Sequence, residues 1–566
     1  MERIMKKAIK RTAAVILLLL LAAPGQLRGE RRPMSLVIMF DGLRVDAPEN
    51  LNMINYTMLR KGQWHPDYRA LFADNCRTVP DALPSSASNH ASIVTGVNAS
   101  THKISSNRDL AAGRFGNCQT YPDRLIEAGK IRQGAFCYQW AADDKIPMGK
   151  KVMRLRCQDK SKNCYQKDEY SVNRLLAMLG KPDTPETLLL FIDSPDSGGH
   201  RGQRINGLQH GFYPYGKEYI YSAAISDWWL GKILTALQQR PTFSQEDWLI
   251  ILCSDHGGLG NGHGPMAEVM GRTTPLLVVS RHIPRSGKML HMPTLMDIAP
   301  AVLAHHGMDT NTLALNGKGF RTTVRQEKKR KLSEDLLYYL PFDTIPFKNH
   351  AGHAETVFKN GRPALVPGCA GNAADFKKDG GFLQLIRSGL PAYENKDNFT
   401  VTFWLRCSVP GKSDAVIFSN KDLKNNSGPG TAFLRRTQTK PADDFYLFSI
   451  GSAEKSGIRR DLYKLHPVKG EWLFFALTKQ AGNTLLAVQG LPDGHLYWMA
   501  EDCSGTQLFT SLPWTINPNG ASPRQSHLDF QMDEFALWTR SLDLSDLRKI
   551  FQAGRSGISL EHLLRK

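Results

Sequence analysis

The sequence has little cysteine and no closely spaced cysteine pair. Nine cysteines occur in 566 residues, and no two of them are spaced as C-x-x-C. The thiolate zinc site that such pairs build is therefore not expected. After the first 30 residues no apolar run is long enough to cross a bilayer, and no nucleic-acid-binding motif, repeat or long low-complexity tract occurs. These absences exclude a polytopic membrane protein and a collagen.

The composition is that of an ordinary globular protein. Hydrophobic residues make up 41% and charged residues 22% of the chain, which excludes a disordered chain. The formal net charge of +19 is spread along the sequence without an arginine-rich arm, and we interpret it as weak steering toward anions. At roughly 150 residues per domain, the length predicts two to four domains.

The N-terminus has the pattern of a targeting segment. A basic stretch over residues 1–12 precedes an apolar run over residues 13–23 that is too short to span a bilayer. We therefore predict a signal peptide over residues 1–29, with an uncleaved signal anchor as the alternative. The mature chain is expected to be secreted, or periplasmic or otherwise extracytoplasmic, without a transmembrane segment.

Export would place the cysteines in an oxidising compartment. Five of them lie in the first third of the chain: Cys76, Cys118, Cys137, Cys157 and Cys164. We expect one or two disulfide bonds among these five, with the connectivity open. Cys253 lies inside the apolar run WLIILC and is expected to be a buried thiol.

Residues 34–323 alternate short apolar runs with helical stretches. The runs SLVIMF, TLLLFID, WLIILCSD and TPLLVVS are continuous, which is typical of strands covered on both faces. Between them lie segments such as YIYSAAISDWWLGKILTALQQ, whose apolar residues recur at helical spacing. This pattern predicts an α/β region with a mostly parallel sheet and helices on both faces.

The pattern of apolar residues changes after a charged stretch. Residues 324–335 read VRQEKKRKLSED, which indicates a linker. Over residues 336–566 the apolar runs are short, aromatic and separated by Gly, Pro, Asn and Asp. This second pattern predicts an all-β jelly-roll sandwich.

Acidic and histidine residues follow the expected strands of the first region. In an open α/β sheet the carboxyl ends of the strands form the ligand crevice, so these residues can converge although they are far apart in the chain. They supply enough nitrogen and oxygen ligands for two zinc-like ions. Each motif alone would more often be a turn or a surface side chain, and it is their combined order that favours a metal site. The residues are Asp41, Asp196, His200, Asp255, His256 and His263.

Serines precede a further predicted helix, ASNHASIVTG, in the segment DALPSSASNHASIVTG. A hydroxyl at a helix N-terminus lies where the backbone N–H groups and the helix dipole favour anions. Taken alone, these serines are better explained as N-cap residues.

Six motifs occur in order within residues 36–308: DGLR, SASNHASIVTG, STHKISSN, PDSGGH, SDHGG and GHG. Together and in this order they resemble the nucleotide pyrophosphatase/phosphodiesterase branch of the alkaline phosphatase superfamily. The resemblance implies that Ser86 is the nucleophile and that Asn107 donates to a phosphoryl oxygen. It also implies two metal sites, preferably for two Zn²⁺, although other divalent transition metals suit the ligands. One ion would be held by Asp196, His200 and His263, and the other by Asp41, Ser86, Asp255 and His256.

The chain departs from the family at two places. The family usually has Thr-Phe-Pro-Asn where this sequence reads Ser86-Ala87-Ser88-Asn89, so Ser85 and Ser88 are neighbouring candidates for the nucleophile. Lys103 follows His102 where the family has glycine.

The activity implied by the resemblance is hydrolysis of phosphodiester or pyrophosphate bonds through a phosphoserine intermediate. The substrate would be a small or glycan-linked phosphoester. A phosphomonoesterase or a sulfatase of the same superfamily is the alternative, although the usual sulfatase signature C/S-x-P-x-R is missing around Ser86. A glycan-binding or adhesion protein with an inactive hydrolase domain is the alternative from another class.

The second region resembles a laminin-G-like, concanavalin A-like jelly roll. The resemblance is carried by YYLPFD, NFTVTFWLRC and MDEFALWTRSLDLSDLRKIF. It implies a glycan or protein ligand for this region, or a role in docking, and it assigns no binding residues.

Overall fold

A computed structural model describes residues 31–565 with internal gaps. The gaps are residues 206–207, 214, 264–267, 322–329, 353–354, 360–361, 378–380, 387–396, 408–414, 423–428, 437–444, 453–459, 466–469, 481–482, 505, 509, 511 and 519–527. The predicted signal peptide and residues 324–329 of the predicted linker thus lie outside the described residues.

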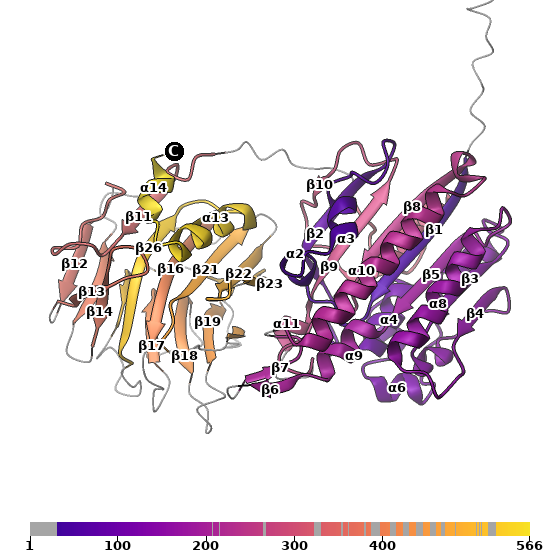
Figure 1. Ribbon diagram of the computed structural model, residues 1–566, viewed down its shortest axis with the longest axis horizontal. Helices are drawn as coiled ribbons and strands as arrows, with labels where there is room; N and C mark the ends of the chain where they lie inside the picture. The colour runs from indigo at the N-terminus through magenta and orange to yellow at the C-terminus, as the bar shows by residue number, and fades with distance from the viewer. Residues whose placement is uncertain are drawn as a thin grey trace, which may run out of the picture.

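The first sheet is mixed and mostly parallel (Figure 1). Its strand order is β10-β2-β9-β8-β1-β5-β3-β4. β1 is parallel to both β5 and β8, whereas β9 is antiparallel to β8 and to β2. The strands are β1 (Arg32–Phe40), β2 (Arg69–Arg77), β3 (Gly134–Tyr138), β4 (Val152–Arg156), β5 (Thr187–Ile192), β8 (Glu246–Cys253), β9 (Thr273–Ser280) and β10 (Gly287–Lys288). A separate hairpin is formed by β6 (Gln203–Ile205) and β7 (Leu208–His210).

Helices cover both faces of this sheet, as the continuous apolar runs predicted. Alternate residues of β1 enter different cores: Leu36 and Ile38 pack in one cluster, and Val37 and Met39 in the other. The first core includes residues of α8 and α10, and the second includes residues of α4, α7 and α12. The helices are α2 (Ala47–Asn50), α3 (Ile54–Arg60), α4 (Ser86–Thr95), α5 (Ala99–His102), α6 (Asn107–Ala111), α7 (Tyr121–Glu127), α8 (Cys164–Leu179), α9 (Ser194–His200), α10 (Lys217–Gln238), α11 (Glu268–Gly271) and α12 (Ile298–His305).

The second region is an antiparallel sandwich, so both predicted fold classes are confirmed. One sheet has the order β13-β14-β26-β16-β21-β22-β23 with β11 beside β26, and the other has β12-β15-β25-β17-β18-β19-β20 with β24 beside β19. The first contains β11 (Leu336–Leu340), β13 (Ala364–Pro367), β14 (Asn372–Phe376), β16 (Phe399–Cys407), β21 (Leu473–Gln480), β22 (Thr484–Gly490), β23 (Leu496–Asp502) and β26 (Phe530–Trp538). The second contains β12 (Glu355–Lys359), β15 (Phe382–Ile386), β17 (Ala415–Ser419), β18 (Thr431–Arg436), β19 (Phe445–Ser452), β20 (Arg460–Leu465), β24 (Thr506–Gln507) and β25 (Trp514–Ile516).

Aromatic side chains fill both faces of strand β16. Phe403 lies between the two sheets, within 5.1 Å of Phe433 and 5.7 Å of Phe475 between ring centres. Its neighbour Trp404 points to the opposite face, where it stacks on Phe551 at 5.8 Å. Phe551 belongs to α13 (Leu544–Arg555), which with α14 (Leu560–Leu564) covers the outside of the sheet. These two helices were not expected from the sequence.

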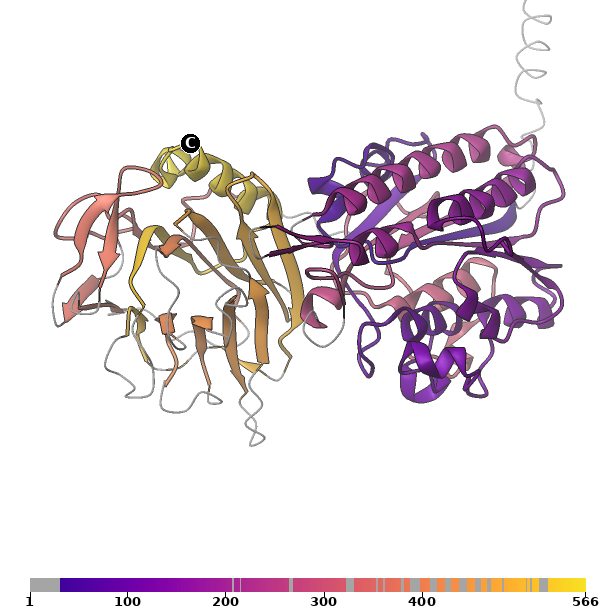
Figure 2. The same cartoon turned by 60° about the horizontal axis from the view of Figure 1, so that its bottom comes forward.

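The two regions meet along β23 (Figures 1 and 2). In both views α11 and the β6–β7 hairpin lie at the junction between the two sheet systems. Thr273 Oγ1 donates to the carbonyl of Ala500 at 3.1 Å, and Arg77 forms an ion pair with Glu501 at 2.7 Å. Asn50 donates to the carbonyl of Leu496 at 3.0 Å. The sandwich is therefore docked on the α/β region through a strand edge.

The expected disulfides are a wrong prediction. All five cysteines of the first third are free thiols. They belong to different elements: Cys137 lies within β3, while the sulfur of Cys164 at the start of α8 is 3.3 Å from Asp193 Oδ2. Cys253 is buried in β8, which confirms the expectation for that residue. Separately, no helix among the described residues has the length and apolar character needed to cross a membrane.

Candidate active site

The predicted metal ligands lie at one edge of the α/β sheet. Asp41 directly follows β1, α9 follows β5, and Asp255 comes two residues after β8. Because these three strands are parallel neighbours, their carboxyl ends meet at the same edge. Asp196 and His200 both lie on α9, four residues apart, so they share one face of that helix.

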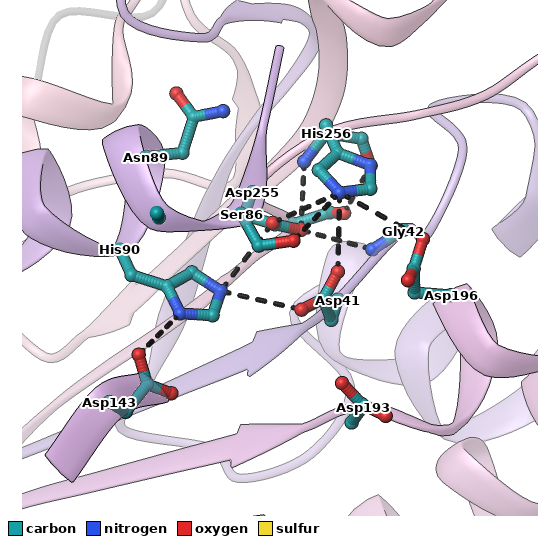
Figure 3. A network of polar contacts seen from close by, with 12 residues as sticks. Asp41, Gly42, Ser86, Asn89, His90, Asp143, Asp193, Asp196, Asp255 and His256 are labelled. Atoms are coloured by element: carbon teal, nitrogen blue, oxygen red, sulfur yellow. Dashed lines mark hydrogen bonds and ion pairs between the residues drawn. The ribbon is translucent and has the colours of Figure 1, made fainter. Parts of the chain in front are cut away.

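His256 lies at the centre of the cluster (Figure 3). Its Nε2 atom is 3.3 Å from Asp255 Oδ2, 3.4 Å from Asp41 Oδ1 and 3.2 Å from the hydroxyl of Ser86. The same atom is 3.9 Å from Asp196 Oδ1. Residues from four segments of the chain thus converge on one imidazole.

The other two predicted histidines lie beside Asp196. His200 Nε2 is 3.3 Å from Asp196 Oδ2, and His263 Nε2 is 3.8 Å from Asp196 Oδ1. The ring of His263 stacks on that of His256 with 3.8 Å between centres. The fold therefore brings all six predicted ligand residues into one cluster.

Ser86 is the first residue of α4, and its side chain is 5% exposed. The preceding residue, Ser85, has an extended backbone with φ −121° and ψ 145°. The Ser85 hydroxyl lies 3.1 Å from the hydroxyl of Ser88. The Ser88 hydroxyl also contacts the carbonyl of Ser85, at 3.0 Å. Of these three hydroxyls, that of Ser86 contacts the Asp/His cluster.

The three cluster histidines share one orientation. In each, Nδ1 lies within hydrogen-bond distance of a backbone carbonyl: His200 at 2.7 Å from Asn261, His256 at 2.9 Å from Gly257, and His263 at 2.8 Å from Pro84. A carbonyl can only accept, so Nδ1 carries a proton in each ring, and Nε2 is the nitrogen that can give its lone pair to a metal ion. This arrangement is typical of metal-binding histidines.

Burial and close charges shift the pKa values of the side chains in the cluster. Burial raises the pKa of Asp41 well above its ordinary value, and the nearby carboxylates of Asp255 and Asp196 raise it further. Burial also acts to raise the pKa of Asp255, but His256 and His90 outweigh it and hold that pKa below its ordinary value. The hydrogen bond to Asp196 raises the pKa of His200 to about 9.

Divalent metal ions fit this cluster. Three buried carboxylate oxygens, Asp41 Oδ1, Asp196 Oδ1 and Asp255 Oδ2, have no hydrogen-bond partner within the described part of the chain, and a buried oxygen without a partner is costly. Two sets of ligand atoms each lie within 4.8 Å of one another: Asp196 with His256 and His263, and Asp41 with His90 and Asp255. Mixed nitrogen and carboxylate donors suit zinc and similar transition metals.

Asn107 lies beside the serine. It begins α6, and its Oδ1 atom accepts from the backbone N–H of Ala87 at 3.1 Å. Because the amide oxygen is engaged there, the NH₂ group is the part of Asn107 that can donate to a phosphoryl oxygen. His102 is buried instead against α4, with Nε2 3.0 Å from Ser92 Oγ. Lys103 adopts φ +66°, the left-handed conformation that suits the glycine of the family motif.

Two functional candidates were missed by the sequence reasoning. His90 lies within the motif SASNHASIVTG, one helical turn after Ser86, and this i, i+4 spacing was the signal that could have found it. Its Nδ1 atom is 2.9 Å from Asp143 Oδ1. Asp143 comes from the 3₁₀ turn η1 (Ala141–Lys145), and no motif in the sequence marks it.

The Arg of DGLR joins the site to the sandwich. Arg44 is 2% exposed, pairs with Asp46 at 2.5 Å and donates to the carbonyl of Gly258 at 2.8 Å. The rings of Tyr213 and Tyr497 have their centres 5.1 and 5.4 Å from its guanidinium carbon. Tyr497 belongs to β23, so a residue of the sandwich contributes to the surroundings of the DGLR loop.

Residues 35–262 match the family of type I phosphodiesterases/nucleotide pyrophosphatases. The match covers less than half of the chain but contains all the motif residues discussed above except His263. Among curated proteins, none matches this chain.

Several solved structures are similar to parts of the chain. Murine ectonucleotide pyrophosphatase/phosphodiesterase 5 is 12% identical, with 50% of this chain and 97% of that chain covered and a TM-score of 0.40. The binding domain of botulinum neurotoxin DC in complex with SialylT is 15% identical, with coverages of 39% and 52% and a TM-score of 0.30. The binding domain of Paraclostridial Mosquitocidal Protein 1 is 12% identical, with coverages of 39% and 53% and a TM-score of 0.32. Similarity at this level says nothing about activity or ligand.

Proposed function

We propose that this protein is a metal-dependent hydrolase of phosphodiester or pyrophosphate bonds, with Ser86 as its nucleophile. The observation that carries the proposal is the position of the Ser86 hydroxyl, 3.2 Å from His256 Nε2 at the N-terminus of α4. It lies in a cluster of carboxylates and histidines that could hold metal ions, and three carboxylate oxygens of this cluster have no hydrogen-bond partner within the described residues. The match of residues 35–262 to the phosphodiesterase family supports the same reaction class.

The ligand assignment follows the motif order. One ion would be held by Asp196, His200 and His263, and the other by Asp41, Ser86, Asp255 and His256. When bound, two zinc ions would lower the pKa of the Ser86 hydroxyl and neutralise the clustered carboxylates.

The chain's own residues then have defined tasks. Ser86 Oγ loses its proton to solvent and attacks phosphorus, the bond to the leaving oxygen breaks, and that oxygen takes up a proton from water. Water then hydrolyses the phosphoserine, which restores the Ser86 hydroxyl and releases the phosphate product. The NH₂ group of Asn107 donates to a non-bridging phosphoryl oxygen and stabilises the charge that develops there. The N-terminus of α4 adds a partial positive charge at the same place.

Turnover of bis-para-nitrophenyl phosphate by the purified full chain tests the proposal. We expect hydrolysis that is lost on chelation and restored by zinc. If a phosphomonoester or a sulfate ester is hydrolysed faster than the phosphodiester, the protein is instead a phosphomonoesterase or a sulfatase of the same superfamily. Absence of turnover with every ester, in a preparation that contains zinc, would instead favour an inactive hydrolase region attached to a binding sandwich.

We also propose an exported protein. This proposal is supported by the predicted signal peptide over residues 1–29, and detection of the mature chain outside the cytoplasm would test it. A small or glycan-linked phosphoester is the proposed substrate, and a glycan or protein the proposed ligand of the sandwich. Binding of the full chain to immobilised glycans tests the latter.

A further inference from the structure

We propose that His90 and Asp143 form a positioning pair that holds the carboxylates of Asp41 and Asp255 in the geometry required for metal binding. The inference rests on the proposed function for its biological meaning. Its test, however, measures zinc affinity and does not depend on turnover.

The pair is buried beneath the cluster. His90 is 1% exposed and Asp143 is fully buried. The imidazole packs edge-on against Phe191 of β5 and against Trp140, with 4.8 and 5.6 Å between ring centres. Aromatic rings on two sides leave the His90 ring little freedom to turn, so the direction of its two nitrogen atoms is set by the fold.

Both nitrogen atoms of His90 face carboxylates (Figure 3). Nδ1 is 2.9 Å from Asp143 Oδ1, while Nε2 is 3.4 Å from Asp41 Oδ2 and 3.5 Å from Asp255 Oδ2. Nε2 thus lies almost equally far from the two cluster carboxylates. Within the described part of the chain Nε2 has no hydrogen-bond partner of ordinary length, so it faces both carboxylates and is bonded to neither.

The two oxygens of Asp41 have different neighbours. Oδ1 is 3.4 Å from His256 Nε2, whereas Oδ2 is 3.4 Å from His90 Nε2. A carboxylate with a histidine facing each of its oxygens has less freedom to rotate about its last bond than one with a histidine at a single oxygen. His90 therefore orients the face of Asp41 that His256 does not reach, and Asp143 in turn orients His90.

A buried histidine with a carboxylate partner is often only a satisfied core group. Two observations favour the positioning role here. The nitrogen that Asp143 does not bind is directed at two metal-ligand candidates, and His90 shares the helical face of Ser86. Partners that orient metal ligands in this way typically account for 10- to 100-fold in metal affinity.

Zinc affinity of the full chain, measured by competition with a chromophoric chelator, tests the pair. We expect His90→Gln and Asp143→Asn to weaken the binding of one zinc ion by about 10- to 100-fold, with the other ion unaffected. His90→Gln keeps a polar side chain of similar reach and is chosen because His90→Ala leaves a cavity. Circular dichroism and the thermal unfolding midpoint of the metal-free variants establish that they fold.

Asp144→Asn is the matched control. Asp144 lies next to Asp143 in η1, but it pairs with Arg156 at 2.6 Å and accepts from Tyr138. We expect its zinc affinity to equal that of the unchanged protein within twofold. The double variant His90→Gln/Asp143→Asn should bind zinc as tightly as the single variant with the lower zinc affinity, because the two residues act as one unit.

The outcomes separate this inference from the proposed function. Unchanged zinc affinity in folded His90→Gln, or additive losses in the double variant, overturns the positioning role. Loss of one zinc ion even at saturating zinc would make His90 a ligand and would also overturn it. If no ester is hydrolysed but the affinities change as expected, the positioning pair stands and the assigned reaction fails.

Discussion

The guanidinium carbon of Arg44 lies 5.4 Å from the ring centre of Tyr497, across the junction between the α/β region and the sandwich. The same guanidinium donates to the carbonyl of Gly258, two residues after His256. Arg44 thus connects Tyr497 of β23 with the backbone segment that carries the proposed metal ligands Asp255 and His256. The sandwich therefore forms part of the support of the site.

Tyr497→Leu is expected to destabilise the docked arrangement. Leucine removes the cation–π contact to a buried guanidinium, which contributes about 2 kcal/mol when desolvated, while it keeps an apolar side chain of moderate size. Urea unfolding of the full chain measures the effect. Tyr497→Phe keeps the ring and should remain within about 0.5 kcal/mol of the unchanged protein, and equal losses in the two variants would show that the ring–cation contact is not the cause.

Ser86→Ala is expected to lower turnover by roughly 10³-fold or more, because the nucleophile is removed. Zinc should still bind through the six other proposed ligands. Ser85→Ala is the matched control, since the Ser85 hydroxyl contacts that of Ser88, and it should retain most of the activity. If Ser85→Ala is the inactive variant, the motif alignment is shifted by one residue.

Removal of the metal should abolish activity, and elemental analysis should find close to two zinc ions per chain. Asp255→Ala and His263→Ala are each expected to remove turnover because each deletes a ligand of a different ion. Near-ultraviolet circular dichroism should show the aromatic core of the sandwich unchanged. A preparation that contains only calcium, or that is fully active without metal, would refute the zinc assignment.

A phosphodiester should be preferred to a phosphomonoester. The monoester dianion carries an extra negative charge, and the donor beside Ser86 is the neutral Asn107. The cationic side chains of Lys103 and Arg108 are exposed, and they would favour the monoester if they turned toward the site. Comparison of kcat/KM for bis- and mono-para-nitrophenyl phosphate decides this. A tenfold excess for the monoester, about 1.4 kcal/mol, would contradict the preference.

The sandwich should lose stability as the pH rises from about 4 to about 8. Burial raises the pKa of Asp533 to about 7, and burial together with Asp533 raises that of Glu534 to about 8. In this window the folded state binds more protons than the unfolded state, so the free energy of unfolding falls with increasing pH. Urea unfolding at pH 5 and pH 8 should show the difference, and Asp533→Asn should reduce it. An unchanged slope in that variant would exclude Asp533 as the source.

The α/β fold and the convergence of the metal ligands were predictable because both depend on local patterns. The continuous apolar run SLVIMF followed by Asp41 places a carboxylate at a strand end, and neighbouring parallel strands bring such ends together. The antiparallel direction of β9 could not be read in this way, because its run TPLLVVS is as continuous as those of the parallel strands.

The parts that were missed depend on contacts between distant residues. Asp143 reaches His90 across 53 positions, and Tyr497 reaches Arg44 from the other region. Neither pairing leaves a periodic or spaced signal in the sequence. The disulfide prediction failed for a related reason: crowding of cysteines along the chain says nothing about the distance between their sulfurs once strands and helices separate them.

The burial of the cysteines shields most of the thiols from reagents in the solvent. Seven of the nine are buried and only Cys118 and Cys369 are partly exposed, and no covalent cross-link ties one described segment to another. Noncovalent packing therefore holds the described segments of the architecture together. Thiol reagents applied to the native protein would reach Cys118 and Cys369 first, and the same reagents applied during unfolding would report directly on the opening of the core.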